Sequence, residues 1–365
     1  MVQPTPGVFR RSMEVRRFLV PNPPPASADA DGAPIGVLLV NLGTPKEPTP
    51  RAVRRFLREF LTDRRIIELP APLWRLCLEV CILPVRARRS AAKYASVWYP
   101  GGSPIMVHSR AQAAALAAAL DPPDAYMVRH AMRYGSPPVA DALSEFEAAG
   151  ANRVLVLPMY PQYSGTTVAT IFDSVARYFA AHRDQPELRW VRSFPTAPLY
   201  IEALARRVEE DWQTAGKPDF AAGDRLLLSC PGTPKAMTDD GDPYPAEGAA
   251  TAAALRARLG LTGEECQVTF QSRFGPGEWL TPATIDTIRR LGHEGTDRVD
   301  VFCPGFVADC LETLEEIDIL NREAFLAAGG DWFRRIPCLN EHPAWIEALA
   351  GLVNSQTQGW RHSSL

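Results

Sequence analysis

Short apolar runs bounded by glycine and proline recur along the chain, and amphipathic or alanine-rich stretches separate them. Each run is too short for a helix of several turns, so the runs predict strands buried on both faces, as in parallel sheets. These strands are expected at residues 37–42, 154–157, 226–229 and 299–302. Helices are expected between them at residues 111–120, 139–149, 200–215 and 246–259. This alternation predicts an α/β fold with doubly wound parallel sheets.

Three local signatures occur twice along the chain and in the same order. The sequence LLVNLGTP (38–45) is echoed by LLSCPGTP (227–234), RYG (133–135) by RFG (273–275), and RVLV (153–156) by RVDV (298–301). Any one of them alone is explained by an ordinary strand-to-helix turn. Together they predict two similar lobes. Ligands in open α/β sheets bind beyond the carboxyl ends of the strands, so both Gly-Thr-Pro turns are expected to face one cleft between the lobes.

The spacing of the signatures predicts where the lobes differ. From Gly43 to Arg133 is 90 residues, and from Gly232 to Arg273 is 41, so the first lobe carries an insertion of about 49 residues. We predict a proline-rich disordered tail at 1–34, an N-terminal lobe at 35–157 plus 335–356, and a C-terminal lobe at 158–334. The insertion is expected to form an apolar lip over the cleft, at about residues 60–90.

The lip contains the most apolar segment of the chain, residues 69–85. Charged residues and three prolines interrupt it, so it is too short and too broken to span a bilayer. The neighbouring basic residues Arg86, Arg88 and Arg89 are consistent with peripheral contact of the lip with a membrane, or with an ordinary solvated charge cluster.

Composition excludes some classes of partner and cofactor. The net charge of −3 and the pI near 6.1 give no overall basic field, which argues against nucleic acid as a partner. The seven cysteines form no CxxC pair and no zinc-finger spacing. We therefore expect reduced thiols in a cytoplasmic protein, with neither an iron–sulfur cluster nor another tightly bound cofactor.

Carboxylates cluster in residues 309–318, called here the acidic segment. The segment has no lysine or arginine, and the spacing of Asp309, Glu312 and Glu316 places these three residues on one face of a helix. Carboxylates near a helix N-terminus gain from the helix dipole, which is a purely structural explanation. Alternatively, hard oxygen ligands suit a divalent metal ion that must arrive and leave, which is a functional one.

Aromatic and basic residues near the predicted turns have two interpretations each. Tyr94, Tyr134 and Trp279 suit a flat conjugated ligand, and they equally suit core packing. Arg133 is positioned either to pair with a ligand carboxylate or to form an ordinary salt bridge.

The longest motifs resemble those of the ferrochelatase family, from about residue 35 to 353. They are VNLGTP (40–45), KYASVW (93–98), GSP (102–104), YPQYS (160–164), GDPYP (241–245), FQSRFG (270–275) and PGFVADCLETL (304–314). The resemblance implies two Rossmann-like chelatase lobes, a porphyrin in the cleft, and insertion of ferrous iron into protoporphyrin IX to make protohaem. Ferrous iron and the porphyrin are then substrates, handled in the cytoplasm or at the inner face of the membrane.

The resemblance also implies roles for individual residues. Glu312 matches the glutamate of the family's metal site, where it would accept pyrrole protons, and Asp309 and Glu316 match the acidic residues behind it. The positions that line the porphyrin pocket are matched by Leu42, Tyr94, Ser103, Arg133, Tyr134 and Trp279.

One position departs from the family pattern. The family places a histidine before the second Gly-Thr-Pro turn, and this chain has Pro231 there. Proline has neither a ligand atom nor a titratable side chain. Cys230 is adjacent, but neighbouring residues at a strand end point apart. The sequence therefore leaves two hypotheses, a ferrochelatase of reduced activity and a catalytically silent relative that binds or carries porphyrin or haem. An unrelated two-lobed small-molecule binder is a third interpretation.

Overall fold

Two four-stranded parallel sheets organise the chain. The computed structural model describes residues 32–275 and 277–360, so nearly all of the predicted tail lies outside the described residues. The strand order is β2-β1-β3-β4 in the first sheet and β6-β5-β7-β8 in the second, which is the same topology. The first sheet contains β1 (Ile35–Thr44), β2 (Tyr126–Gly135), β3 (Arg153–Pro158) and β4 (Glu187–Trp190). The second contains β5 (Arg225–Pro231), β6 (Cys266–Gln271), β7 (Arg298–Phe302) and β8 (Trp332–Arg335).

The four strands predicted from apolar runs are the two central strands of each sheet, β1 and β3 and then β5 and β7. Their side chains are buried at almost every position, because helices cover both faces of a doubly wound sheet. The predicted α/β class and the two-lobed repeat are confirmed.

Helices connect the strands and cover both faces of each sheet. The predicted helices correspond to α4, α5, α7 and α9. In the first half of the chain lie α4 (Pro104–Ala119), the short η2 (Pro123–Ala125), α5 (Val139–Ala148) and α6 (Val168–Ala180). The second half contains α7 (Pro198–Ala215), η3 (Phe220–Ala222), α8 (Lys235–Asp239), α9 (Tyr244–Leu259), α10 (Thr284–His293), the π-helix η4 (Glu312–Asn321), α11 (Arg322–Ala327) and α12 (Pro343–Gln356).

The glycines of the two Gly-Thr-Pro turns are required for the same steric reason in both lobes. A Cβ atom at Gly43, where φ is +117°, would lie 1.8 Å from the carbonyl oxygen of Tyr134. A Cβ atom at Gly232 would lie 2.7 Å from the carbonyl oxygen of Gln271. Both turns therefore need glycine because the chain passes close to the backbone of the neighbouring strand.

The lobe boundary differs from the prediction. Strand β4 pairs with β3, with Val154 opposite Leu188, so the first sheet continues past the boundary expected at residue 157. One hydrophobic core also extends into both lobes, joining Leu39 of β1 to Leu228 of β5 through α7 and α12. The lobes therefore share buried surface instead of meeting only at a linker.

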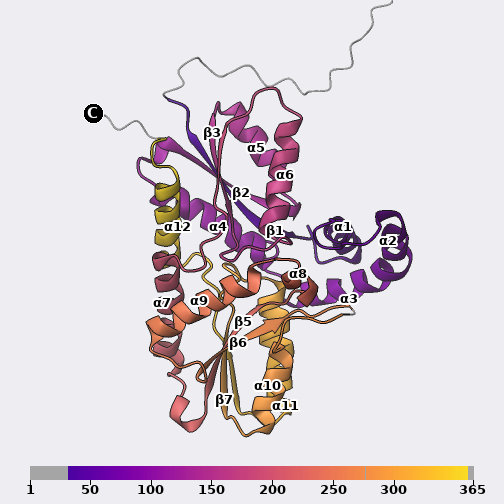
Figure 1. The fold of residues 1–365 in the computed structure, drawn as a ribbon, viewed down its shortest axis with the longest axis vertical. Helices are drawn as coiled ribbons and strands as arrows, with labels where there is room; N and C mark the ends of the chain where they lie inside the picture. Colours follow the sequence, from indigo (N-terminus) through magenta and orange to yellow (C-terminus); the bar gives the residue numbers. More distant parts are fainter. Residues whose placement is uncertain (1–31, 276, 361–365) are drawn as a thin grey trace, which may run out of the picture.

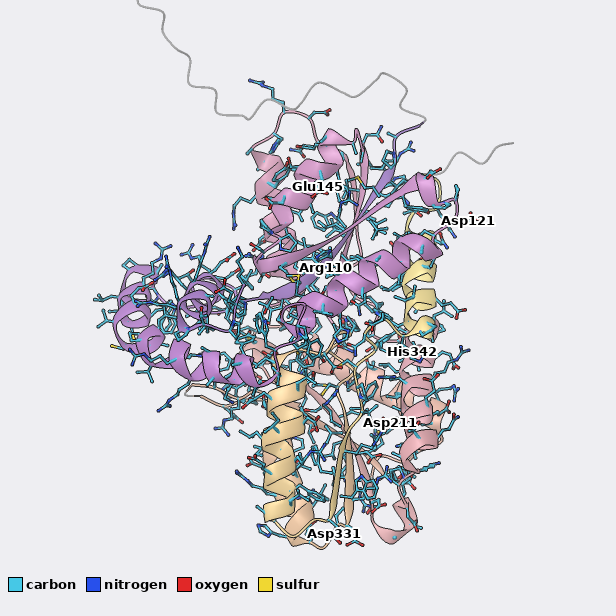
Figure 2. The ribbon with its side chains drawn as sticks, turned by 180° about the vertical axis from the view of Figure 1, so that it is seen from behind. Arg110, Asp121, Glu145, Asp211, Asp331 and His342 are labelled. Carbon is cyan, nitrogen blue, oxygen red and sulfur yellow. The ribbon has the colours of Figure 1, made fainter. Side chains whose placement is uncertain are left out.

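Helix α12 begins at the junction of the lobes. The ring of His342 accepts a hydrogen bond from the backbone N–H of Ala344 at 3.2 Å, and its Nε2 lies 2.8 Å from Glu210 of α7. Figure 2 shows His342 at this start, above Asp211 of α7. On this side of the molecule α12 and α7 run along the first and second lobes respectively (Figure 1).

The predicted insertion folds as helices between β1 and β2. It contains α1 (Pro50–Leu61), α2 (Ala71–Cys77), the π-helix η1 (Leu78–Ile82) and α3 (Leu83–Ser96). These helices project from the side opposite α12 and α7 (Figure 1). None of the helices in residues 32–275 and 277–360 is long and apolar enough to cross a membrane.

Candidate functional site

The acidic segment follows β7 and does not form the single helical face that its spacing predicts. A turn at Cys303–Phe306 ends the strand, and Asp309 precedes the helix. Glu312 is the first residue of η4, a π-helix, and such helices occur frequently at functional sites. The prediction of one α-helical face carrying Asp309, Glu312 and Glu316 is therefore wrong in its geometry.

Asp309 belongs to a buried polar network. Its carboxylate accepts hydrogen bonds from Arg335 at 2.8 Å, from the side-chain amide of Asn340 at 2.7 Å, and from the Thr313 hydroxyl at 2.9 Å. Burial alone would raise the pKa of Asp309, but the Arg335 charge and these hydrogen bonds outweigh it and lower the pKa. Both oxygens are thus engaged by protein donors.

Glu316 is also engaged by protein groups. Its two oxygens accept hydrogen bonds from the backbone N–H of Ser272 at 2.7 Å and from the Ser272 hydroxyl at 2.6 Å. Burial raises the pKa of Glu316, with a further contribution from the charge of Glu312. Ser272 has a positive φ of 67°, so this contact fixes a turn just after β6.

The other acids of the segment form ion pairs. Glu315 pairs with Lys93 of α3 at 2.8 Å, and Asp318 pairs with Arg322 and, at 3.3 Å, with Arg335. Within the described part of the chain, no three histidine, cysteine or acidic side chains are grouped so as to hold a metal ion. The structure does not assemble Asp309, Glu312 and Glu316 into one set of metal ligands.

Glu312 differs from its neighbours because neither a cation nor a backbone N–H binds its carboxylate among the described residues. It lies close to residues of the first lobe: its charge, after the larger effect of burial, contributes to a raised pKa of Tyr94. Burial and the Tyr134 and Glu312 side chains likewise raise the pKa of Tyr160. Residues of both lobes therefore meet at this carboxylate.

Tyr160 was not predicted as a site residue. Its hydroxyl is buried and has no hydrogen-bond partner within residues 32–275 and 277–360. The YPQYS motif that contains it gave the only sequence signal. A buried unpaired hydroxyl is costly in a folded protein unless a water or a ligand binds it, so Tyr160 is a candidate contact for a ligand near Glu312.

Pro231 is the last residue of β5 and lies in register with Gln271 of β6. The Gln271 side chain accepts a hydrogen bond from Ser229 at 2.7 Å, and its amide lies 3.5 Å from the carbonyl oxygen of Glu312. Gln271 therefore connects the end of β5 with the start of η4. This connection places Pro231, which has no ligand atom, in the neighbourhood of Glu312.

Cys230 is poorly suited to bind a metal ion in place of the histidine that the family resemblance implies at position 231. The side chain is buried, and burial raises the pKa of its thiol to about 12, so the thiol stays protonated near neutral pH. Three of the histidines have other partners: His108 lies 2.8 Å from Glu341, His342 lies 2.8 Å from Glu210, and His182 lies 2.8 Å from the carbonyl oxygen of Tyr178.

Three predicted pocket residues come together in one hydrophobic cluster. Leu42, Tyr94 and Tyr134 pack with the inner faces of α1 and α3, so they form the wall between the first sheet and the lip. Tyr134 donates a hydrogen bond to Asp63 at 2.9 Å, and its pKa is raised mainly by burial. Ser103 is buried and caps α4 by accepting a hydrogen bond from the Met106 N–H at 3.4 Å.

Arg133 has a structural partner. Its guanidinium forms an ion pair with Asp63, donates to the carbonyl oxygen of Thr170 at 2.8 Å, and lies 4.4 Å from the ring centre of Tyr134. The Arg133 and Asp63 side chains are only 10% and 11% exposed. Of its two predicted roles, the structure therefore contains the salt bridge.

Trp279 lies in the second lobe, on the loop after β6. Its ring centre is 5.1 Å from that of Phe274, and its indole N–H is buried without a partner among the described residues. The guanidinium of Arg86, from α3 of the lip, lies 5.0 Å from the Phe274 ring centre. Together with the Lys93–Glu315 ion pair, this contact connects the lip to the second lobe.

The outer face of the lip is apolar and exposed. Leu73, Leu76 and Val80 are 70%, 64% and 64% exposed, and Leu69 and Val85 are exposed as well. The spacing of residues 73, 76 and 80 is helical, so these side chains form one stripe on α2 and η1, and Leu69 lies just before α2. An exposed aliphatic stripe of this kind is typical of a contact surface.

Comparison with known proteins agrees with this architecture. The profile of the protein family described as Ferrochelatase matches residues 34–357. The structure of SirB from Bacillus subtilis with Fe3+ is similar at a TM-score of 0.52 and 12% identity, covering 90% of this chain and 98% of that chain. At this identity the similarity concerns the fold alone.

Two further solved structures resemble the chain at lower scores. The sirohydrochlorin chelatase SirB from Bacillus subtilis subspecies spizizenii, in complex with cobalt, has a TM-score of 0.47 and 10% identity, and covers 88% of this chain and 95% of that chain. DR2241 from Deinococcus radiodurans, a multi-domain protein described as structurally similar to chelatases, has a TM-score of 0.45 and 13% identity. The match covers 88% of this chain and 55% of that one.

Proposed function

Because the chain belongs to the ferrochelatase family, we propose that it inserts ferrous iron into protoporphyrin IX at a site around Glu312. The observation that carries this proposal is the contrast within the acidic segment. The carboxylates of Asp309, Glu315 and Glu316 accept hydrogen bonds from a cation or a backbone N–H. Among the described residues, the Glu312 carboxylate interacts instead with the Cys310 thiol, which is a weak donor. Of the acids in this segment, Glu312 is therefore the one that is available to a substrate.

Glu312 suits both halves of the reaction. Metal insertion requires that the two pyrrole N–H protons leave the macrocycle, and a half-buried carboxylate at the junction of the lobes is a suitable proton acceptor. A carboxylate is also a hard ligand that holds a divalent ion loosely enough to release it. Beside it, the buried Tyr94 and the partly buried Tyr160 supply flat surface for a conjugated ring.

Pro231 supports a second candidate function, a porphyrin or haem carrier without turnover. The family histidine is absent, and neither Cys230 nor a histidine of the chain takes its place near Glu312 within the described residues. Loss of a catalytic acid or base costs on the order of a hundredfold to ten-thousandfold in rate, so the first function predicts slow metallation and the second predicts none.

The test is anaerobic incubation of the protein with ferrous iron and protoporphyrin, followed by the change in the porphyrin absorption spectrum. Wild type is compared with Pro231→His, Glu312→Gln and the matched control Glu315→Gln, whose carboxylate is bound by Lys93. We expect slow turnover in wild type, faster turnover in Pro231→His, and a loss only in Glu312→Gln. Metallation at the protein-free rate in both wild type and Pro231→His would refute the enzyme and leave the carrier.

The same assay determines the substrate when it is repeated with cobalt, coproporphyrin and sirohydrochlorin. Greater activity with sirohydrochlorin or cobalt than with protoporphyrin and iron would reassign the reaction within the chelatases. We further propose that the protein works in the cytoplasm with its lip resting on the inner face of a membrane, where a hydrophobic porphyrin partitions. The exposed Leu73–Leu76–Val80 stripe supports this placement.

A further inference from the structure

A cavity opens on the first lobe, and Glu312 is not among the residues that line it. Its volume is about 620 Å3, which is large enough for a small metabolite. It lies between the N-terminal part of α1 and the carboxyl ends of β1 and β2. None of Tyr94, Tyr160, Pro231 or Glu312 lines it. The lining residues are Thr44, Pro45, Lys46, Glu47, Thr49, Arg51, Ala52, Arg54, Arg55, Phe56, Arg58, Glu59, Gly135 and Ser136.

The wall of this cavity is strongly basic in a chain whose net charge is −3. Five of its residues are cations and two are carboxylates. Glu59 is occupied, because it accepts a hydrogen bond from the backbone N–H of Gly135 at 3.0 Å. Arg54 and Arg58 are also occupied, since both bind Glu79 of the lip.

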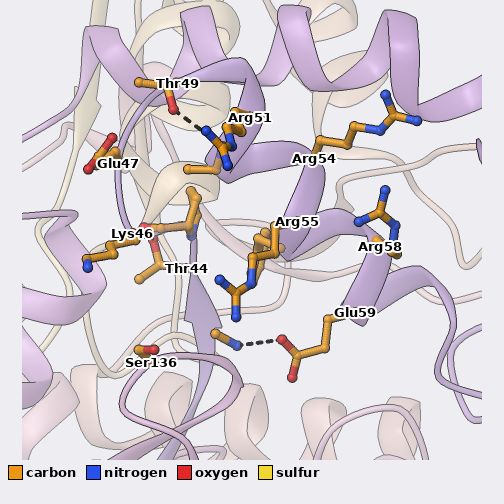
Figure 3. Close-up of a pocket in the computed structure, with 14 residues that line it drawn as sticks. Thr44, Lys46, Glu47, Thr49, Arg51, Arg54, Arg55, Arg58, Glu59 and Ser136 are labelled. Atoms are coloured by element: carbon orange, nitrogen blue, oxygen red, sulfur yellow. Dashed lines mark hydrogen bonds between the residues drawn. The ribbon is translucent and has the colours of Figure 1, made fainter.

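The remaining cations, Lys46, Arg51 and Arg55, form no hydrogen bond or ion pair with any described residue. Arg51 and Arg55 are one helical turn apart on α1, so both face the cavity. Figure 3 shows the Arg55 guanidinium extending between Lys46, Ser136 and Glu59. Like charges held at such spacing repel one another, so they do not stabilise the fold.

We propose that this cavity binds a small anionic ligand that carries a diphosphate group. Three unpaired cations match a ligand with two to four negative charges, whereas a single carboxylate would leave most of the positive charge uncompensated. Guanidinium forks pair with phosphate oxygens in a bidentate manner. The cavity also lies beyond the carboxyl ends of two parallel strands, where α/β sheets bind ligands, and the exposed Ser136 hydroxyl is a further donor.

The test is calorimetric titration of the full chain with inorganic pyrophosphate at constant ionic strength. We expect saturable one-site binding, and a dissociation constant at least tenfold weaker for the double variant Arg51→Glu/Arg55→Glu. The matched control is Arg88→Glu/Arg89→Glu, which makes the same change of charge on α3 outside the cavity, and it should bind as wild type does. Lys46→Glu, in the loop before α1, gives a second variant that does not alter a helix, and it should also weaken binding.

Three results of these titrations would overturn the proposal, and a competition experiment provides a fourth. They are the absence of saturable binding of pyrophosphate, an equal loss in the α3 control, and tighter binding of citrate, a tricarboxylate of similar charge. Release of pyrophosphate by a saturating carboxylated tetrapyrrole would also overturn it, because the cavity would then be part of the tetrapyrrole site.

Discussion

Replacement of Asp309 tests whether this carboxylate stabilises the fold or binds a metal ion. Asp309 and Arg335 are both nearly buried, with side-chain exposures of 4% and 12%, and Asn340 and Thr313 complete the hydrogen bonds of the carboxylate. In Asp309→Ala, Arg335 keeps only its longer contact with Asp318 at 3.3 Å. We therefore expect Asp309→Ala to lower the free energy of unfolding, because a buried guanidinium loses its main counter-charge.

The magnitude follows from the burial of the pair. Removing one partner of a buried ion pair costs about 3 to 5 kcal/mol. With an unfolding entropy of about 2.1 cal/mol/K per residue, this loss corresponds to a decrease in Tm of about 4 to 7 °C for the 365-residue chain. Glu312→Ala is the control. Since no cation in the described part of the chain binds Glu312, this substitution should lower the free energy of unfolding by less than about 1 kcal/mol.

The assay is thermal unfolding followed by circular dichroism, together with metallation activity. The pH dependence gives a second readout. Because the pKa of Asp309 is lowered in the folded state, its stabilisation is present above the ordinary aspartate pKa of about 3.9 and is lost as the pH falls below it. The difference in stability between wild type and Asp309→Ala should thus shrink in acid. An unchanged Tm combined with lost metal binding would refute this reasoning and restore Asp309 as a metal ligand.

Two further predictions concern the lip and the wall behind it. Asp63→Ala should destabilise the protein by about 3 to 5 kcal/mol, because it leaves Arg133 buried without its counter-charge. Tyr134→Phe removes one hydrogen bond and should cost about 1 kcal/mol. Urea unfolding measures both free energies, and equal losses would contradict the ion pair as the main contribution. Leu73→Glu/Leu76→Glu should abolish co-sedimentation with anionic vesicles without lowering Tm, because both side chains are exposed; vesicle binding that is equal to wild type would remove the lip as the contact surface.

The elements that sequence predicted well are those whose pattern is local. The central strands β1, β3, β5 and β7 are buried on both faces, so each is a continuous apolar run. The edge strands were missed because their burial is partial or alternating, as in β2, or almost absent, as in β4. Since β4 has no apolar run, the lobe boundary was also placed too early.

The candidate site divides in a similar way. Glu312 and its neighbourhood followed from the order of the motifs, and Pro231 is visible in the sequence alone. The partners of the other acids cannot be recognised in the sequence, because Lys93, Ser272 and Arg335 lie far from those acids along the chain or after intervening elements. The pattern of residues 309–318 does not predict which of their carboxylates binds a distant arginine.

The sequence by itself determined the repeated α/β lobes, the inserted lip and the proline at position 231, because each depends on a local run of residues. Only the tertiary structure decided which acids are bound by a cation or a backbone N–H, and that Arg133 is held by Asp63. It also decided that three cations of the first lobe line a cavity without a partner among the described residues. Charges are paired by distances in space, and those distances depend on how the strands and helices pack.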